Sequence, residues 1–260
     1  MTRIFLDRVS KSFKSDDGTT SVLSDLTMDI SSPSFTVVIG PNGCGKTTLL
    51  SLIAGVEQSD SGSVAITVDH PGRPQVGYVW QDYRASLLPW LSVGENISYP
   101  LYLRGKGRRD RRSVAMKVLN EFLPGVGVNQ PCYELSGGQQ QLVSLLRSIV
   151  TTPDFLLFDE PLSALDQPSK WTIAFRIERI WMDQQVPAIF VSHDIDEAIM
   201  LADHIHLMGK RGGGIERTLL NELPRPRNVK MLTSNEHIRC RSEVIQFLTE
   251  RGAIRDSATP

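Results

Sequence analysis

Residues 40–48, Gly-Pro-Asn-Gly-Cys-Gly-Lys-Thr-Thr, have the residue types and the spacing of a phosphate-binding loop. Residues 40–47 match the pattern G-x-x-x-x-G-K-[ST]. The three glycines allow backbone angles and close approaches that a side chain would block, so that successive N–H groups can turn inward around an anion. Lys46 supplies a compact positive charge for the β- and γ-phosphates, and the Thr47 hydroxyl can ligate Mg²⁺.

The sequence on both sides of this loop fits the binding of a nucleoside triphosphate. Residues 35–39 are apolar and β-branched and predict a buried strand, and residues 48–54 have the composition of a helix. A strand, a glycine loop and a helix N-terminus form the setting in which such a loop binds phosphate. A glycine turn with a chance lysine is the alternative, and the full match in this setting argues against it. The residues expected around the phosphates are Gly40, Pro41, Asn42, Gly43, Cys44, Gly45, Lys46, Thr47 and Thr48.

Two adjacent carboxylates, Asp159 and Glu160, end the apolar run 155–158. An Asp at the end of a buried strand opposite a phosphate loop commonly holds Mg²⁺, directly or through water. Glu160 could orient and deprotonate an attacking water, and general-base help of this kind is typically worth about 10²–10⁴-fold. The alternative is a pair of solvated carboxylates at a strand end. That alternative does not explain why a fully apolar strand leads directly into them.

Three further residues stand where they could reach a bound nucleotide. Gln81 follows the predicted strand 76–80, and His193 ends the predicted strand 188–193, where a histidine can contact a γ-phosphate. Phe13 is an aromatic residue just before the first predicted turn, and stacking of such a ring on adenine is worth about 1–3 kcal/mol. A structural histidine and an ordinary strand-end aromatic are the alternatives.

A serine and two glycines at 136–138 open a predicted helix with one apolar face. Free N–H groups and the helix dipole make the start of this helix a second possible anion site. Taken alone, Ser-Gly-Gly is often no more than a helix cap. The apolar face follows the 3.6-residue period through Leu142, Leu145, Leu146, Ile149 and Val150.

The remaining elements predict an α/β fold. Apolar alternation at 3–9 and 22–30, broken by polar residues 15–20, predicts two antiparallel strands and a turn. A last strand is predicted at 205–208, before a flexible turn at 212–214.

Further helices are predicted over 113–123 and after Asp166. A non-helical connector at 223–227 precedes a short amphipathic helix with Val244, Ile245 and Leu248. The helix after Asp166 has one apolar face, formed by Ile173, Ile177, Ile180 and Trp181.

Composition limits the classes of protein to consider. At 260 residues the chain can be one domain or two small ones, and 40% apolar residues are enough for a core. The 28 basic and 29 acidic residues suggest neither a nucleic-acid binder nor an acidic tail. The basic run 104–112 could touch lipid headgroups or an acidic partner, but a solvated loop and helix start is the commoner explanation.

The cysteines indicate the redox environment of the chain, and the hydropathy indicates how it could relate to a membrane. The three cysteines are too far apart for a metal or redox motif, and their odd number argues against a disulfide framework, so a reducing cytoplasm is expected. No apolar run approaches the ~18–20 residues that span a bilayer, and the N-terminus lacks a signal-peptide core. Any role at a membrane is therefore expected to be peripheral.

Taken in order along the chain, these features resemble the ATP-binding subunit of an ABC transporter. LSGGQ between a phosphate loop and an acidic strand is the most specific part of the resemblance, which covers roughly residues 3–210. Small GTPases are excluded by LSGGQ and by the lack of an Asn-Lys-x-Asp guanine motif. The matching features are the loop at 40–47, Gln81, LSGGQ at 135–139, Asp159 and Glu160 after their strand, SALD at 163–166, and His193.

The resemblance implies a P-loop NTPase core with an antiparallel β subdomain and a helical subdomain. It places an ATPase domain at residues 1–225 and, within it, a helical subdomain at about 82–135 that docks on a permease. Residues 226–260 would form a short C-terminal helical tail.

The resemblance also implies roles for the site residues. Lys46, Gln81, Glu160 and His193 would be catalytic. Thr47, Gln81 and Asp159 would hold Mg²⁺. The ATP contacts outside the loop would come from Phe13 at the adenine, from Asp166 across a dimer interface, and from Ser136, Gly137, Gly138 and Gln139 at the γ-phosphate bound to the partner cassette. Because the chain has one copy of each motif, a complete site needs two cassettes head to tail, as a homo- or heterodimer.

The expected function is that of an ATP-hydrolysing importer subunit, peripheral at the cytoplasmic face of the inner (plasma) membrane. Its partners would be a transmembrane permease, a second cassette and, indirectly, a substrate-binding protein, with no nucleic acid. Residues 86–93 and 223–227 resemble the nitrate/sulfonate/taurine importer branch, which implies uptake of a small anion such as nitrate, taurine or an alkanesulfonate.

Other functions remain open at this point. An ABC exporter or lipid transporter would use the same ATPase motifs. A soluble ABC ATPase acting on nucleic acid would usually carry long coiled-coil insertions or tandem cassettes, and this sequence has neither. A nucleotide-binding module without turnover is disfavoured by Glu160 and His193.

Overall fold

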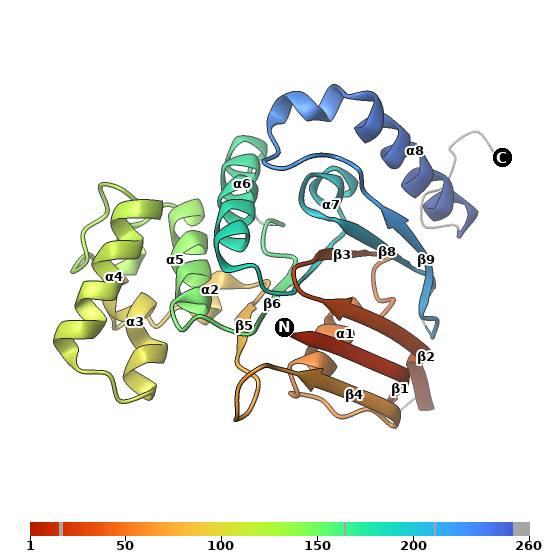
Figure 1. Ribbon diagram of the computed structural model, residues 1–260, viewed down its shortest axis with the longest axis horizontal. Coiled ribbons are helices and arrows are strands. Elements are labelled where there is room, and N and C mark those ends of the chain that lie inside the picture. The colour runs from red at the N-terminus through yellow and green to blue at the C-terminus, as the bar shows by residue number, and fades with distance from the viewer. Residues whose placement is uncertain (16–17, 164, 211, 252–260) are drawn as a thin grey trace.

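Two sheets form the framework of the chain (Figure 1). The structure, a computed structural model, describes residues 1–251 except 16, 17, 164 and 211. The larger sheet has the order β5-β6-β7-β3-β8-β9 and the smaller one the order β2-β1-β4. The larger sheet contains β3 (Phe35–Ile39), β5 (Val76–Val79), β6 (Phe155–Asp159), β7 (Ala188–Ser192), β8 (His204–Met208) and β9 (Ile215–Leu220). The smaller, antiparallel sheet contains β1 (Arg3–Ser15), β2 (Gly18–Ser31) and β4 (Ser61–Thr67).

Helices pack on the larger sheet and extend beyond its β5 edge (Figure 1). Helix α1 packs between the two sheets, and α5, α6 and α7 pack on the opposite face of the larger sheet. The helices are α1 (Lys46–Ile53), α2 (Tyr83–Ser86), α3 (Val93–Leu103), α4 (Arg108–Phe122), α5 (Gly137–Ile149), α6 (Gln167–Gln184), α7 (Ile195–Leu201) and α8 (Asn235–Glu250), with 3₁₀ turns η1 (Cys132–Glu134) and η2 (Val229–Thr233).

The central strands are buried on both faces, as their unbroken apolar runs predict. Successive residues alternate between two cores. In β6, Leu156 and Phe158 pack toward the core with α5 and α6, whereas Phe155 and Leu157 pack toward the core with α1. The two-residue period of the strands therefore divides the apolar side chains between two cores, one formed with α5 and α6 and one with α1 and the smaller sheet.

The parallel strands of the larger sheet end at one edge and at one level. Ile39 at the end of β3 pairs with Ser192 at the end of β7. Asp159 at the end of β6 pairs with Val191. Because carboxyl ends of parallel strands meet at one edge, the segments that follow β3, β6 and β7 are brought together there.

Most predicted elements are present, and two strands are additional. The antiparallel pairing of 3–9 with 22–30 is confirmed, although part of the predicted turn at 15–20 lies outside the described residues. The prediction of 205–208 as the last strand is wrong, because β9 follows and pairs antiparallel with β8. Strand β4 completes the smaller sheet, and its mostly exposed Ser-Gly-Ser-Val-Ala-Ile-Thr sequence carries only a weak strand signal.

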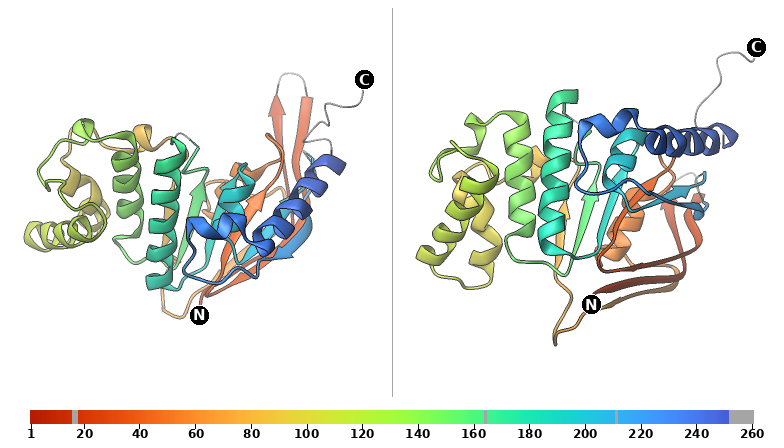
Figure 2. Two further views of the ribbon diagram at one scale, coloured as in Figure 1. Left: turned by 90° about the horizontal axis from the view of Figure 1, so that it is seen from above. Right: turned by 45° about the horizontal axis from the view of Figure 1, so that its top comes forward.

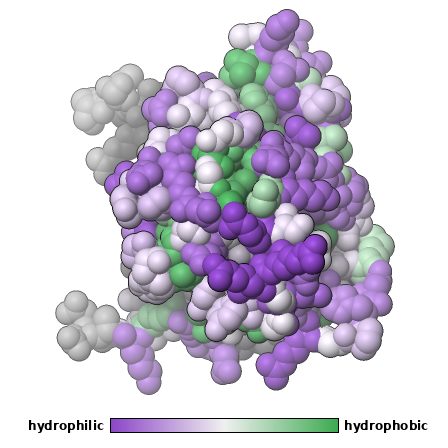
Figure 3. Space-filling model, turned by 90° about the vertical axis from the view of Figure 1, so that its left-hand side faces the viewer, coloured by the Kyte–Doolittle hydropathy of each residue, from purple (hydrophilic) through white to green (hydrophobic). Residues whose placement is uncertain are grey.

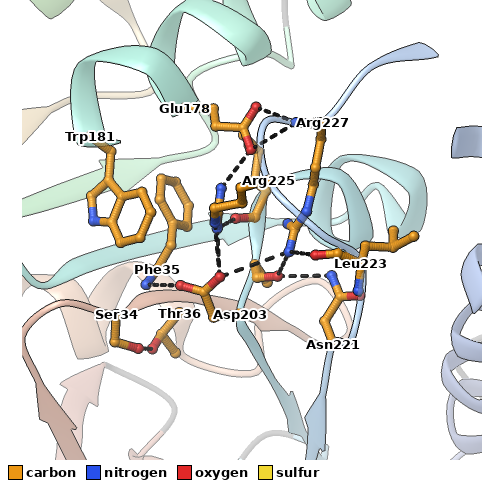
Figure 4. A network of polar contacts seen from close by, with 12 residues as sticks. Ser34, Phe35, Thr36, Glu178, Trp181, Asp203, Asn221, Leu223, Arg225 and Arg227 are labelled. Atoms are coloured by element: carbon orange, nitrogen blue, oxygen red, sulfur yellow. Dashed lines mark hydrogen bonds and ion pairs between the residues drawn. The ribbon is translucent and has the colours of Figure 1, made fainter. Parts of the chain in front are cut away.

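The segment 223–227 is non-helical, as predicted, and a polar network fixes it to the core (Figure 4). The Arg225 guanidinium lies 2.7 Å from Glu178 Oε1 and 4.4 Å from the centre of the Trp181 ring. The side chain of Arg227 is 1% exposed, and burial lowers its pKa to about 10. The connector is therefore part of the packed structure.

Helix α8 follows this connector and lies across α7 (Figure 2). The amphipathic helix predicted around Val244 is present as α8, which has 16 residues. Val244 and Leu248 are buried on its inner face, and Ile245 is half-buried. Across the part of the chain that the structure describes, no helix has the length and hydropathy to cross a membrane.

Candidate functional site

A pocket of about 590 Å³ opens where β3, β6 and β7 end. Its lining residues include Phe13, Asn42, Gly43, Gly45, Lys46, Thr47, Thr48, Gln81, Glu160 and His193. Each of these is a residue that the sequence predicts for the ATP site, and Val22 completes the lining. Residues from five separate parts of the chain therefore face one opening.

The loop at 40–48 has the backbone geometry of an anion nest. Gly43 and Gly45 have φ angles of 75° and 108°, which residues with side chains rarely adopt. A Cβ at Gly45 would also lie 2.8 Å from Leu23 Cδ2, because the loop packs on β2. The Lys46 ammonium group donates to the carbonyl oxygens of Gly40 at 3.0 Å and of Pro41 at 3.2 Å. Its charge is therefore held at the loop, where a bound phosphate would lie.

Asp159 and Thr47 place two oxygen ligands side by side. Thr47 Oγ1 donates to Asp159 Oδ1 at 3.1 Å. Burial raises the pKa of Asp159, the Thr47 hydrogen bond opposes this, and the charge of Glu160 adds to it. Mg²⁺ prefers oxygen ligands and usually takes one or two carboxylates together with substrate phosphates. The residues fit this ion, because a cation here would also compensate the buried carboxylate.

Glu160 and His193 are joined by a hydrogen bond across the ends of β6 and β7. His193 Nδ1 lies 2.9 Å from Glu160 Oε2. An ionised carboxylate can only accept, so Nδ1 carries the proton of this bond and Nε2 is the nitrogen left for a ligand. Glu160 has a φ of 45°, and its N–H donates to the Val191 carbonyl oxygen at 3.1 Å. A glutamate in the left-handed backbone region costs conformational energy. Such strained residues are typical of functional sites.

An ion network that the sequence does not predict holds the segment that carries His193. Lys170 Nζ on α6 lies 3.0 Å from Asp194 Oδ2 and 2.8 Å from Glu197 Oε1. Ser192 Oγ donates to Glu197 Oε2 at 2.7 Å and accepts from Asp194 N at 2.9 Å. The residues on both sides of His193 are thus fixed to α6.

The LSGGQ residues lie at a different place. Ser136 caps α5 by accepting from Gln139 N, and Gln139 Oε1 accepts from Ser136 N at 2.9 Å. With residues of α6, they and Gly138 line a separate pocket of about 250 Å³ and not the pocket at Lys46.

Asp166 is also absent from the lining of the pocket at Lys46. It caps α6 by accepting from Ser169 N. Hydrogen bonding to Ser169, first to its side chain and then to its backbone, lowers the pKa of Asp166. Ala164, which precedes it in SALD, lies outside the described residues. One chain therefore assembles the Lys46 part of the predicted site but does not bring the LSGGQ residues or Asp166 to it.

Two tyrosines contribute to these surroundings without being predicted. The Tyr78 hydroxyl is buried beside Asp159, and burial, followed by the Asp159 charge, raises its pKa, so it stays a neutral phenol. Tyr83 on α2 packs against LSGGQ, since a Cβ at Gly137 would lie 2.8 Å from its hydroxyl oxygen. No local pattern marks either residue, because both contacts join distant parts of the chain.

Known proteins resemble the chain in sequence and in structure. The ABC transporter family model matches residues 23–163. The aliphatic sulfonates import ATP-binding protein SsuB of Bacillus thuringiensis subsp. konkukian is 35% identical over 98% of this chain and 99% of the relative. The bicarbonate transport ATP-binding protein CmpC of Synechocystis sp. is 34% identical over 97% of this chain and 38% of the relative. The ATP-binding cassette MJ0796, a dimer in a post-hydrolysis state bound to ADP and Pi, has a TM-score of 0.72 and 27% identity over 85% of this chain and 100% of that chain.

Replacing Lys170 with Met is expected to loosen residues 192–197, because the buried Glu197 and the half-buried Asp194 would lose their counter-charge. Amide hydrogen exchange in this segment should become faster than in the wild type. Lys170→Arg keeps the charge and should stay close to wild type, and Lys117→Met on the exposed face of α4 serves as the matched control. Unchanged exchange in Lys170→Met would show that the network does not hold the segment.

Asp159→Asn is expected to stabilise the chain free of nucleotide and metal at neutral pH. The pKa of Asp159 is raised above its ordinary value of 3.8, so the wild type loses stability as the pH rises through the window above that value. The neutral amide avoids this loss. The gain in Tm should therefore be present at about pH 7 and shrink toward about pH 4, near the unfolded-state value. A variant that melts below the wild type at neutral pH would contradict the prediction.

Proposed function

The chain belongs to the ABC transporter family, and we propose that it is the ATP-hydrolysing subunit of an importer for a small oxyanion. It has the fold of the ATPases of this family and is itself an ATPase, which converts ATP and water to ADP and phosphate. The observation that carries the proposal is the single pocket lined by Lys46, Thr47, Glu160 and His193. A phosphate cradle, a metal-binding hydroxyl, a general base and a γ-phosphate contact are what hydrolysis requires.

ATP binds with its triphosphate in the loop at 40–48 and its adenine on Phe13. The Phe13 side chain is 40% exposed and lines the same pocket as Lys46, which supports stacking. Thr47 and Asp159 would hold Mg²⁺, with Gln81 reaching it from another wall, and the ion would neutralise charge on the β- and γ-phosphates. Backbone N–H groups and Lys46 hold the phosphates in place, so positioning and charge compensation supply most of the catalysis.

Glu160 is the proposed general base. His193 Nδ1–H engages Glu160 Oε2, so Oε1 is the oxygen that accepts the proton of the attacking water. His193 Nε2 contacts the γ-phosphate. The network at Lys170 holds the segment on which this histidine lies. His193 therefore keeps a fixed position relative to Glu160 and to the γ-phosphate.

A second cassette completes the proposed site. Ser136, Gly137, Gly138 and Gln139 of one copy close on the γ-phosphate held by Lys46 of the other, and Asp166 crosses the interface. Two observations support this arrangement. Ser136 and Lys46 line different pockets of one chain, and the similar cassette MJ0796 is a dimer. The second cassette is another copy of this chain or a related one.

The proposed permease contact lies on the helical part of the chain, within residues 82–135. Trp90 is 76% exposed, yet its loop is fixed by the buried Asn96, which bonds the backbone of Leu88 in both directions and the carbonyl oxygen of Leu91. This large exposed aromatic side chain on a fixed loop is the observation on which we base the proposed contact. Other large exposed apolar or aromatic residues within this range are Tyr102, Leu103 and Tyr133.

The cargo proposal comes from the relatives. SsuB imports aliphatic sulfonates and CmpC transports bicarbonate, and both cargoes are small oxyanions. The proposed cargo is therefore an alkanesulfonate, taurine, nitrate or a similar anion, delivered to the permease by a substrate-binding protein. The chain would act at the cytoplasmic face of the membrane, peripherally bound through the permease.

Glu160→Gln is expected to bind ATP and to accumulate as a dimer, because the phosphate cradle is intact while the base is lost. Turnover should fall by about 10²–10⁴-fold. Phosphate release and size-exclusion chromatography with ATP and Mg²⁺ measure the two effects. Glu121→Gln, on the exposed end of α4, is the matched control and should keep the wild-type rate. Phosphate release from Glu160→Gln at the wild-type rate would contradict the proposed role.

Uptake assays test the transport direction and the cargo. Cells that express the chain with its permease should accumulate labelled taurine, alkanesulfonate or nitrate, and Glu160→Gln should abolish accumulation because no hydrolysis drives it. ATP-dependent loss of solute from the cells would contradict an importer. Uptake of none of the three anions, with ATPase activity intact, would contradict the cargo class alone.

A further inference from the structure

A second charged pocket lies in the helical part of the chain, apart from the ATP site. Its volume is about 260 Å³, and it lies between the start of α3, the start of α4 and residues 128–129. It shares no lining residue with the pocket at Lys46. Figure 3 views the molecule from the side of α3 and α4, and a band of strongly hydrophilic residues crosses this face. The pocket is not part of the proposed hydrolysis site.

The wall on the side of α3 is preformed. Ser92 and Glu95 make a capping box in which Glu95 Oε2 accepts from Ser92 N at 3.0 Å and from Ser92 Oγ at 2.8 Å. Gly94 N donates to Val128 O at 2.9 Å. A Cβ at Gly94 would lie 2.3 Å from Val128 Cγ2, so only glycine permits this approach. A ligand would find this wall already ordered, which lowers the entropic cost of binding.

Three guanidinium groups come from one face of α4, because Arg108, Arg111 and Arg112 have i, i+3 and i+4 spacing. Arg112 Nη1 donates to Asn129 Oδ1 at 2.7 Å, and Arg111 Nε donates to Lys106 O at 3.1 Å. These two groups are thereby oriented and still have free N–H donors. Arg108 has no hydrogen bond or ion pair within the described part of the chain.

The charges that line the pocket do not cancel. Glu95 is the one acid among the lining residues, so three guanidinium groups and one carboxylate leave two positive charges. The arginines also stand at the N-terminus of α4, where the helix dipole disfavours cations. Three arginines on the first turn of a helix break a local preference, which is expected where a site serves a function.

We propose that this pocket binds a phosphate monoester. Such a group carries about −1.5 to −2 charges near pH 7, which matches the two uncompensated positive charges. Planar guanidinium groups bind phosphate oxygens in pairs of parallel hydrogen bonds. The volume of about 260 Å³ lies just below the roughly 300–1,000 Å³ of ligand pockets, so the pocket takes a phosphate group and not a whole nucleotide. The group belongs either to a phospholipid headgroup or to a small phosphorylated solute.

Two binding assays on the full chain distinguish these sources. Co-sedimentation with phosphatidylcholine vesicles, with and without phosphatidic acid, tests the lipid headgroup. Calorimetric titration with glycerol 3-phosphate, with the ATP pocket saturated by ADP, tests the solute. Binding in either assay is the expected result, and the assay that responds assigns the source. Binding in neither would overturn the proposal.

Variants of one helix test whether the pocket itself is responsible. Arg108→Gln is expected to weaken the responding assay by roughly ten- to a hundredfold, since it removes charge-assisted hydrogen bonds. Arg112→Gln should also weaken it. Arg109→Gln removes the same charge from the same helix but lies outside the pocket, so it should retain binding. Equal losses in Arg108→Gln and Arg109→Gln would overturn the proposal, because general surface charge would then account for binding.

Discussion

Parallel pairing of β5, β6, β7 and β3 in one register is the constraint on which the ATP site depends. The register sets Asp159 level with Val191 and Ile39 level with Ser192. It therefore fixes how far the phosphate loop, the two carboxylates and His193 stand from one another. Both faces of these strands are buried in different cores, so a slip of one residue would exchange the two sets of side chains and is strongly disfavoured. The hydrophobic packing of the sheet thus determines the geometry of the chemistry at its edge.

The site keeps several features that reduce the stability of the folded chain. Asp159 is a buried carboxylate with a raised pKa, and Glu160 has a positive φ. The side chains of the polar network around Lys170 are largely buried as well. Proteins retain such features where a function requires them, and the surrounding packing maintains them. A bound cation and triphosphate would compensate much of this cost, which couples ligand binding to the stability of the same edge of the sheet.

Short-range patterns predicted the framework of the fold and of the site. Apolar runs between turn residues were enough for β3, β6 and β7, and the loop at 40–48 follows from its glycines and Lys46. Contacts between distant residues were not predictable in this way. The Glu160–His193 bond, the Lys170 network and the arginine pocket on α4 each depend on how elements pack, and no local pattern encodes this. Strands β4 and β9 were missed because half-exposed edge strands have weak apolar alternation.

The central claim is that each ATP lies between Lys46 of one cassette and the Ser136 turn of another. A crystal structure of the chain with Mg²⁺ and a non-hydrolysable ATP analogue tests it directly. The account predicts two chains head to tail, with the γ-phosphate between Lys46 and His193 of one chain and Ser136 of the other. A nucleotide bound outside the pocket at Lys46, or one enclosed by a single chain, would contradict it.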